Sequence, residues 1–339
     1  MTGSSRARGA VGPLGLLSLD VGGAVRGEVR GAGHRRVSHG LYRPLTRGNE
    51  FEEFLRDLQA WRQVLPDGSA FTHLTAARLR GWQLPKLPEQ VPVFAAVHAG
   101  TSRPRRPGLL FSRLVGDAKF EVRHGLPVER AEEVLLRAAR DLGQLDLVVM
   151  VDSALRLDDL DPLRMEHLLD SRRPGVRALR QAWQLSDRRA ESGGETLLRQ
   201  FHVVLEIPVE PQAVLVDDHG RRLGRADLLV VGTREVHEYD GAHHRDGRQH
   251  QVDLRRERAF GTSYRRRGFT LDDLLNQSAT VMHELDRVLD RPHDLARLRR
   301  WRTLVEHSLY SATGRQRLTN RWQRDAGIVD WRSAARRAA

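Results

Sequence analysis

Two apolar segments in the second half of the chain are each interrupted by acidic residues. The first covers residues 225–231 and carries Asp227, and the second covers residues 235–240 and is followed by Gly241. Short apolar runs that end at a glycine are typical of β-strands. The pattern therefore predicts two neighbouring strands that both carry acidic side chains to one edge of a sheet.

The alternation of a strand sorts the side chains of the second segment onto two faces. Glu238 and Asp240 share one face, whereas His237 and Tyr239 share the other. Carboxylates on one face can converge on one ion, together with Asp227 of the preceding strand. A single acid at a strand end usually only meets solvent, so the hypothesis depends on the ordered set. His237 is expected to be a packed strand histidine rather than a ligand.

Apolar residues at helical spacing predict helices over much of the remaining chain. The predicted helices cover residues 51–65, 72–81, 127–142, 145–155, 161–169, 175–185 and 191–202. Residues 91–98 and 109–114 are predicted to form the two strands of a small hairpin, joined by a basic loop. The predicted fold class is α/β, or α+β overall, in which a mainly helical N-terminal domain with that hairpin precedes a domain that contains the two acidic strands.

A chain of 339 residues with 40% hydrophobic content can bury more than one core. Residues 1–34 are rich in Gly and Arg and predict a disordered basic leader. The sequence Ser171-Arg-Arg-Pro-Gly175 favours a boundary between an N-terminal domain, residues 35–171, and a second domain, residues 172–293. Residues 294–339 predict a basic helical tail that packs on the second domain or binds nucleic acid or a partner.

Composition excludes several classes of protein. No apolar run approaches membrane-spanning length, and the stretch from residue 11 to 25 is interrupted by Asp20, so we expect a cytoplasmic protein without a membrane partner. The absence of cysteine excludes disulfides and thiolate zinc sites.

The formal net charge of +12 suits a polyanionic partner, because basic side chains that neutralise phosphates release counterions. Only two of the basic side chains are lysines, which is typical of GC-rich codon usage and lowers the weight of this argument. The arginines of the predicted hairpin loop, Arg103, Arg105 and Arg106, are candidates for nucleic-acid contact, with a merely solvated loop as the alternative.

The stretch from Glu238 to His244, EYDGAHH, resembles the acid-x-Asp-Gly-x-x-His signature of the very-short-patch-repair-like branch of the PD-(D/E)XK nuclease superfamily. Glu195 matches the acid of the family's preceding helix, and Asp227 matches its first strand acid. A polar segment, a strand and a last helix follow in the family's order at residues 253–258, 264–269 and 271–275. The resemblance covers residues 172–290 and implies a restriction-endonuclease-like mixed sheet.

The resemblance also implies a division of roles in the site. Asp227 and Glu238 would hold Mg²⁺ or Mn²⁺, and Glu195 would position the attacking water. Asp240 stands where the superfamily name promises a lysine, and the resemblance implies that His244 assists the water or the leaving group instead. Arg255 and Arg256 of the following segment are candidates for phosphate binding, or for the solvated face of a helix.

Part of the N-terminal half is similar to actinobacterial proteins related to the AbiEi-type antitoxins. Residues 35–44 are similar to the wing of their winged-helix motif, and residues 68–82 are similar to their Ser/Thr-His-x-Ser/Thr-Ala-Ala segment. The resemblance implies a partial winged helix that supplies DNA binding or partner contacts. His73, at the predicted start of a helix, is expected to make a structural hydrogen bond rather than to act in catalysis.

Two hypotheses of different classes follow. The first is a metal-dependent endonuclease of DNA repair or defence type that hydrolyses phosphodiester bonds, with DNA favoured over RNA as its partner. The second is a non-catalytic DNA-binding regulator, an antitoxin-like repressor with a degenerate nuclease fold. Both leave room for a protein partner that the sequence does not identify.

Overall fold

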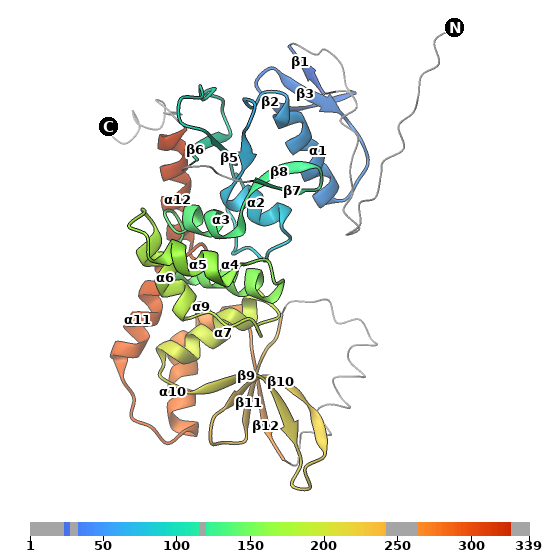
Figure 1. Cartoon of the computed structure of the whole chain (residues 1–339). Coiled ribbons are helices and arrows are strands. Elements are labelled where there is room, and N and C mark those ends of the chain that lie inside the picture. Colours follow the sequence, from blue (N-terminus) through green and yellow to red (C-terminus); the bar gives the residue numbers. More distant parts are fainter. Residues whose placement is uncertain (1–23, 28–32, 115–119, 242–262, 327–339) are drawn as a thin grey trace. The chain divides into compact units, whose positions relative to one another are not determined.

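The computed structural model of the chain describes residues 24–27, 33–114, 120–241 and 263–326 (Figure 1). Helices and mixed sheets both occur, so the fold belongs to the α/β class. The chain divides into two compact units. Unit 1 comprises residues 1–81, 89–137 and 317–339, and unit 2 comprises residues 82–88 and 138–316. No helix in the described ranges is long and apolar enough to cross a membrane.

Within the described residues, unit 1 contains two sheets and all or most of four helices. Its larger sheet has the order β6 (Leu109–Arg113), β5 (Val93–Val97), β4 (Ala70–Phe71), β8 (Leu126–Glu129) and β7 (Phe120–Arg123). Its smaller sheet has the order β1 (Val25–Arg26), β3 (Leu41–Pro44) and β2 (His34–Ser38). The helices are α1 (Glu50–Arg62), α2 (His73–Leu79), α3 (Ala131–Ala138) and α12 (Ala312–Asp325), which joins unit 1 from residue 317 on.

The N-terminal half contains more strand than its sequence pattern indicates. Strands β5 and β6 pair in parallel, so the predicted hairpin between them is wrong. The hairpins that do form are β2–β3 and β7–β8, which turn at His39-Gly40 and His124-Gly125. The sequence pattern predicts a helix that begins at residue 127, but residues 127–129 belong to strand β8. Val128 pairs with Phe71 in the centre of the sheet, where burial on both faces favours a strand.

Unit 2 is built on a four-stranded mixed sheet. The sheet has the order β12 (Arg265–Phe269), β11 (Glu235–Tyr239), β10 (Arg222–Val230) and β9 (Val209–Val216). Strands β9, β10 and β11 are antiparallel neighbours, and β12 is parallel to β11. The helices are α4 (Gln144–Arg156), α5 (Pro162–Leu169), α6 (Val176–Gln184), α7 (Gly193–Val204), α9 (Leu271–Leu275), α10 (Ser278–Val288) and α11 (Leu295–Glu306).

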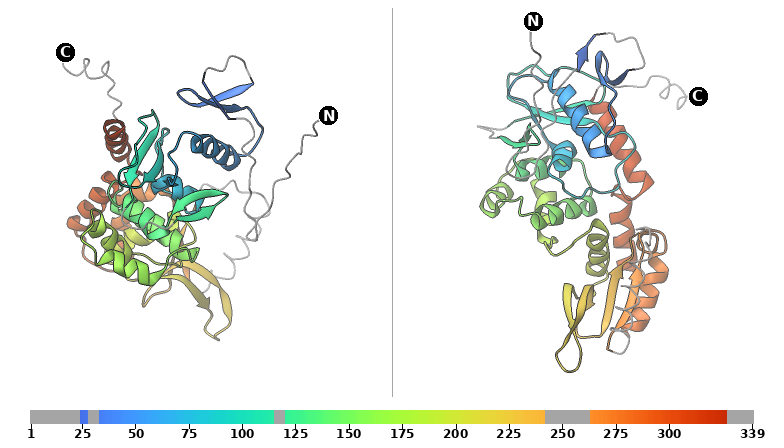
Figure 2. Two further views of the ribbon diagram at one scale, coloured as in Figure 1. Left: turned by 45° about the horizontal axis from the view of Figure 1, so that its top comes forward. Right: turned by 90° about the vertical axis from the view of Figure 1, so that its right-hand side faces the viewer.

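The main core of unit 2 lies between α7 and one face of this sheet. Leu197 and Phe201 of α7 pack with Leu228 of β10, and α10 closes the core with Met282 and Leu285. In Figures 1 and 2 helix α10 runs beside the strands. Because α7 covers one face only, its packing determines which residues of β10 and β11 are buried and which face away from the helix.

The two units divide the chain at residues other than those the sequence suggests. Helices α4 and α5 belong to unit 2, although the sequence places them before a boundary at residue 171. Helix α4 is buried almost all round, and it packs against α6 and α7, which explains its place in unit 2. Helix α11 buries Trp301 in the same core as α7, so this part of the predicted tail packs on the sheet domain.

A buried ion pair ties α7 to α4. The Asp152 carboxylate accepts hydrogen bonds from Arg199 Nη2 (2.6 Å), Thr196 Oγ1 (2.8 Å) and the Asp187 amide (2.8 Å). Burial raises the pKa of the Asp152 carboxyl, and the nearby Arg199 charge opposes that rise. The network fixes the rotation of α7, which is the helix that carries Glu195.

Asp152→Ala should lower the free energy of unfolding by about 3–5 kcal/mol, because it leaves the buried Arg199 guanidinium without its carboxylate. Urea denaturation followed by circular dichroism measures this loss. Arg188→Ala, which removes an exposed ion pair with Asp158, is the control and should change stability little. Equal effects of the two substitutions would contradict a special role for the buried pair.

Candidate active site

The pairing of β10 with β11 brings the two predicted metal ligands together. Leu228 pairs with His237, and Leu229 pairs with Val236, so the next step of the same register sets Asp227 opposite Glu238. Side chains at opposite positions of an antiparallel pair lie on the same face, with Cβ atoms about 5 Å apart. The sequence expectation that acids of two neighbouring strands converge is consistent with this register.

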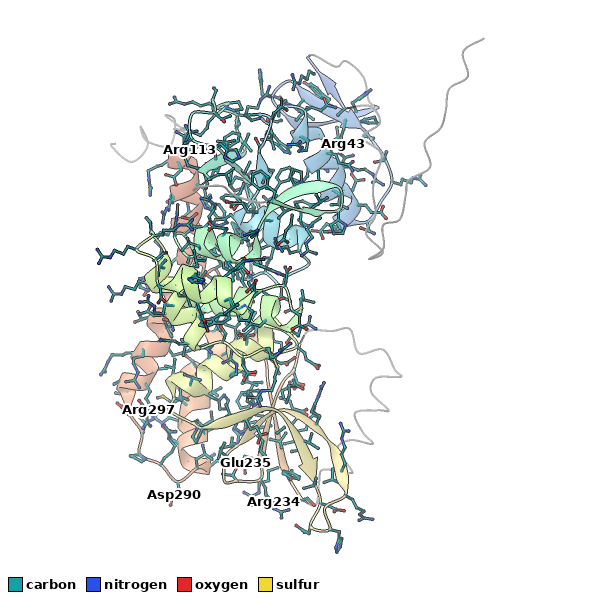
Figure 3. All side chains as sticks on the ribbon, in the orientation of Figure 1. Arg43, Arg113, Arg234, Glu235, Asp290 and Arg297 are labelled. Atoms are coloured by element: carbon teal, nitrogen blue, oxygen red, sulfur yellow. The ribbon has the colours of Figure 1, made fainter. Side chains whose placement is uncertain are left out.

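Asp227 also binds the last residue of β11. Its Oδ2 accepts the amide N–H of Tyr239 at 2.9 Å. The amide of Tyr239 in β11 is thus bound by a side chain of β10 and not by a backbone carbonyl of that strand. The same hydrogen bond fixes the orientation of the Asp227 carboxylate. Figure 3 shows the opposite end of β11, which starts at Glu235 after Arg234.

Arg266 of β12 lies close to both Glu238 and Asp240. Its Nε donates a hydrogen bond to Glu238 Oε2, and its Nη2 lies 4.0 Å from Asp240 Oδ1. The parallel register pairs Val236 with Arg266 and Glu238 with Gly268, which puts Arg266 on the face of the acids. The sequence reasoning missed Arg266, although the run Arg265-Arg266-Arg267 in a strand was a visible signal.

Gly268 makes room for one of these acids. A Cβ atom at position 268 would overlap with the Oδ2 atom of Asp240. The glycine thus allows the Asp240 carboxylate to lie close over strand β12. Glu238 is 8% exposed, whereas Asp240 is exposed, so the pair combines one buried and one accessible carboxylate.

Glu195 reaches the sheet from the first turn of α7. Its Oε2 accepts hydrogen bonds from the Glu191 amide (2.8 Å) and from Gln212 Nε2 of strand β9 (2.9 Å). Its Oε1 makes no hydrogen bond within the part of the chain that the structure describes. Ser192 caps this helix by accepting the Glu195 amide at 3.1 Å, which sets where the helix begins.

A ring of contacts joins α7 to β9, to β10 and to the last residue of β11. Gly194 abuts the Tyr239 ring so closely that a Cβ atom there would overlap with it. Tyr239 donates its amide to Asp227, and Asp227 lies opposite Gln212 in the register of β9 and β10. Gln212 completes the ring at Glu195. Glu195 and Asp227 are therefore held at the same level along the strands, with Glu195 on the helix that covers the buried face and Asp227 on the opposite face of β10.

His202 and His237 form a buried pair behind the acids. Leu198 O lies 2.8 Å from His202 Nδ1, so that nitrogen carries the proton, and His202 Nε2 accepts from His237 Nδ1 at 2.7 Å. Burial lowers the pKa of His202 to about 4. Burial, with the His202 and Arg267 charges, lowers the pKa of His237 to about 2. The prediction that His237 is a packed strand histidine is confirmed.

Several predicted residues lie elsewhere. His244, Arg255 and Arg256 lie outside the described residues. Arg103, Arg105 and Arg106 belong to unit 1, in the segment between β5 and β6. Arg103 and Arg105 are exposed there, whereas Arg106 donates to the backbone oxygen of His39 (2.6 Å) in the β2–β3 turn.

His73 makes the structural hydrogen bond expected at a helix start. Its Nδ1 accepts the Leu74 amide at 2.8 Å, and its ring stacks on Phe94 with the centroids 4.2 Å apart. The residue is 4% exposed.

The donor set of the site fits a hard divalent cation. Magnesium prefers carboxylate oxygens and usually takes only one or two from a protein, keeping water and substrate oxygens as its other ligands. Asp227 and Glu238 could supply two carboxylates. Within the described ranges no group of three or more His, Cys, Asp or Glu side chains is placed to hold a metal ion.

Comparisons of the chain with known protein families, curated proteins and solved structures found no similar protein. The chemistry of the site must therefore be inferred from its own residues.

The buried histidine pair predicts a loss of stability in acid. Both pKa values are lowered on folding, so the unfolded chain binds more protons between the ordinary value of 6.5 and the folded values of about 4 and about 2. The free energy of unfolding should fall as the pH drops below about 6.5, by about 1.4 kcal/mol per pH unit for each imidazole.

Urea denaturation between pH 7.5 and pH 5 measures this dependence. His237→Gln keeps a hydrogen-bonding side chain but removes one titrating group, so its stability should vary less steeply over the same range. An unchanged pH dependence in that variant would show that other groups cause the acid sensitivity.

Proposed function

We propose that unit 2 is a metal-dependent endonuclease domain that hydrolyses phosphodiester bonds in DNA. The observation that carries the proposal is the β10–β11 register, which sets Asp227 opposite Glu238. The contacts of Glu195 with Gln212 and of Gly194 with Tyr239 support it, because they hold a third carboxylate at the level of Asp227 along the strands. Convergent carboxylates at a sheet edge suit metal-assisted phosphodiester hydrolysis.

The order of the elements supports a restriction-endonuclease-like arrangement of the PD-(D/E)XK type. Helix α7 precedes three antiparallel strands, and β12 then joins the sheet parallel to β11. The resemblance implies a mixed sheet flanked by helices, and this order of elements supports it. The repair-type branch, with His244 in place of the usual lysine, remains part of the proposal.

Each residue of the proposed site has a distinct role. Asp227 and Glu238 would hold Mg²⁺ or Mn²⁺. Such an ion, when bound, stabilises negative charge on the phosphate and lowers the pKa of a bound water. Glu195, with Oε2 fixed by two donors, would orient the attacking water through Oε1. His244 would accept or donate a proton near neutral pH.

Arg266 would supply the fixed positive charge that Asp240 cannot. A guanidinium stays protonated, and its planar fork of donors matches the oxygens of a phosphate. It lies beside Glu238 on the face of the acids, so it can turn from that carboxylate to a phosphate oxygen when a cation takes its place. Its role would be to bind and orient the phosphate.

The composition supports a nucleic-acid substrate. The net charge is +12 and the calculated isoelectric point is near 11.1, as expected for a protein that binds a polyanion. Arg255, Arg256, Arg103, Arg105 and Arg106 remain candidates for contact with the phosphate backbone. The cytoplasmic location and the role in repair or defence stay predictions.

The same arginine favours an alternative function. Arg266 neutralises Glu238 and approaches Asp240, as it would in a nuclease fold that has lost its metal. A non-catalytic DNA-binding regulator would keep this ion pair permanently. Removal of an acid near the DNA would then leave affinity unchanged or increase it.

Purified protein should nick supercoiled plasmid DNA in the presence of Mg²⁺ or Mn²⁺, and Asp227→Asn and Glu238→Gln should each lose at least about 100-fold in rate. Asp218→Asn is the matched control, because Asp218 lies in the β9–β10 connection and pairs only with exposed Arg234 among the interactions seen. Salt-sensitive DNA binding without cleavage in any preparation would favour the regulator.

Arg266→Ala should lower the cleavage rate without weakening Mn²⁺ binding, because it removes a phosphate contact and also a cation that competes for Glu238. Arg266→Lys keeps the charge and should retain more activity than the alanine variant. Cleavage assays and calorimetric Mn²⁺ titration distinguish the two effects. Full activity of Arg266→Ala would exclude Arg266 from the site.

A further inference from the structure

Gln212 has an unusual backbone conformation for a strand residue. It lies within β9, but its φ angle is +54°, in the left-handed region. The structure describes five other non-glycine residues with positive φ. Three of them lie two residues beyond the end of a helix, one lies in the β7–β8 turn and one begins α2. Such strain within a strand persists only where surrounding contacts maintain it, and it is concentrated at functional sites.

The conformation changes the direction of the Gln212 side chain. Pro211 and Ala213 are buried, whereas Glu210 and Val214 are exposed, so regular alternation would place Gln212 on the exposed face. Its Nε2 instead donates to Glu195 Oε2 at 2.9 Å, on the helix that covers the buried face. The left-handed residue is what allows a strand side chain to reach α7.

The distortion occurs at the level of the proposed metal ligand. Strand β9 pairs Ala213 with Ala226 and Pro211 with Leu228, and the intervening step sets Gln212 opposite Asp227. The register is the same on both sides of that step, so no residue is inserted there. The positive φ of Gln212 therefore changes the direction of its side chain without shifting the register of β9 and β10.

We infer that Gln212 is a positioning residue that fixes Glu195 relative to Asp227. The Gln212 amide donates a hydrogen bond to Oε2 of Glu195 and so fixes the orientation of that carboxylate. Its other oxygen, Oε1, is then oriented to bind a water molecule or a metal ion. The inference rests on the proposed function and adds to it a residue that the sequence motif does not contain. Supporting residues of this kind typically change metal affinity or activity by about 10–100-fold.

Two substitutions separate positioning from stability. Gln212→Ala and Gln212→Gly both remove the amide, but only glycine adopts a positive φ without strain. The glycine variant should therefore melt roughly 2–4 °C above the alanine variant. Both should nevertheless lose about 10–100-fold in kcat, with the KM for plasmid DNA within about twofold of wild type.

Val214→Gly is the matched control on the same strand. Val214 is exposed and its φ is not positive, so glycine there should lower the melting temperature and leave kcat unchanged. Recovery of wild-type kcat in Gln212→Gly would mean that Gln212 acts only on stability, and it would overturn the inference. Full kcat in both Gln212 variants would overturn it as well.

Calorimetric titration with Mn²⁺ distinguishes failure of this inference from failure of the proposed function. If the wild type does not cleave but binds Mn²⁺ in a manner lost in Asp227→Asn, the nuclease proposal fails. A Kd weakened about 10-fold in both Gln212 variants would then still support the positioning role. If the wild type neither cleaves nor binds Mn²⁺, both proposals are overturned.

Discussion

The candidate site depends on the register in which strand β10 pairs with β11. A slip of one residue would turn every side chain of β11 to the other face, burying Glu238 against α7 and exposing His237. Several contacts oppose such a slip. Leu228 packs in the core under α7, His237 is hydrogen-bonded to His202 of that helix, and Tyr239 donates its amide to Asp227. The apolar face thus sets the position of the acids.

Buried polar contacts then fix the helix that faces this sheet. Apolar packing alone allows α7 to rotate or slide slightly, but hydrogen bonds have narrow distance and angle limits. Asp152 holds Arg199 and Thr196 at one side of α7, and the neutral His202–His237 pair joins the helix to β11. These bonds also determine the position of Glu195, although none of them involves Asp227 or Glu238.

The acidic region also carries features that are unfavourable for stability. Asp227 and Glu238 lie opposite each other, and like charges at such positions repel. Arg266 reduces that repulsion, and close contacts at Gly194 and Gly268 leave no room for a side chain there. With the strained backbone of Gln212, these features form one group around a single end of the sheet. Local backbone strain and like charges gathered in this way are typical of functional sites.

The sequence by itself determined the strands that carry Asp227 and Glu238, the face these acids share, and helices α4 to α7 to within a few residues, because strand alternation and helical spacing are local. It did not determine the parallel pairing of β5 with β6 or the division into two units. Nor did it indicate the roles of Arg266 and Gln212. Arg266 follows Glu238 by 28 positions, and Gln212 follows Glu195 by 17. Contacts between residues so far apart exist only once the strands pair and α7 packs on them, so only the tertiary structure decided them.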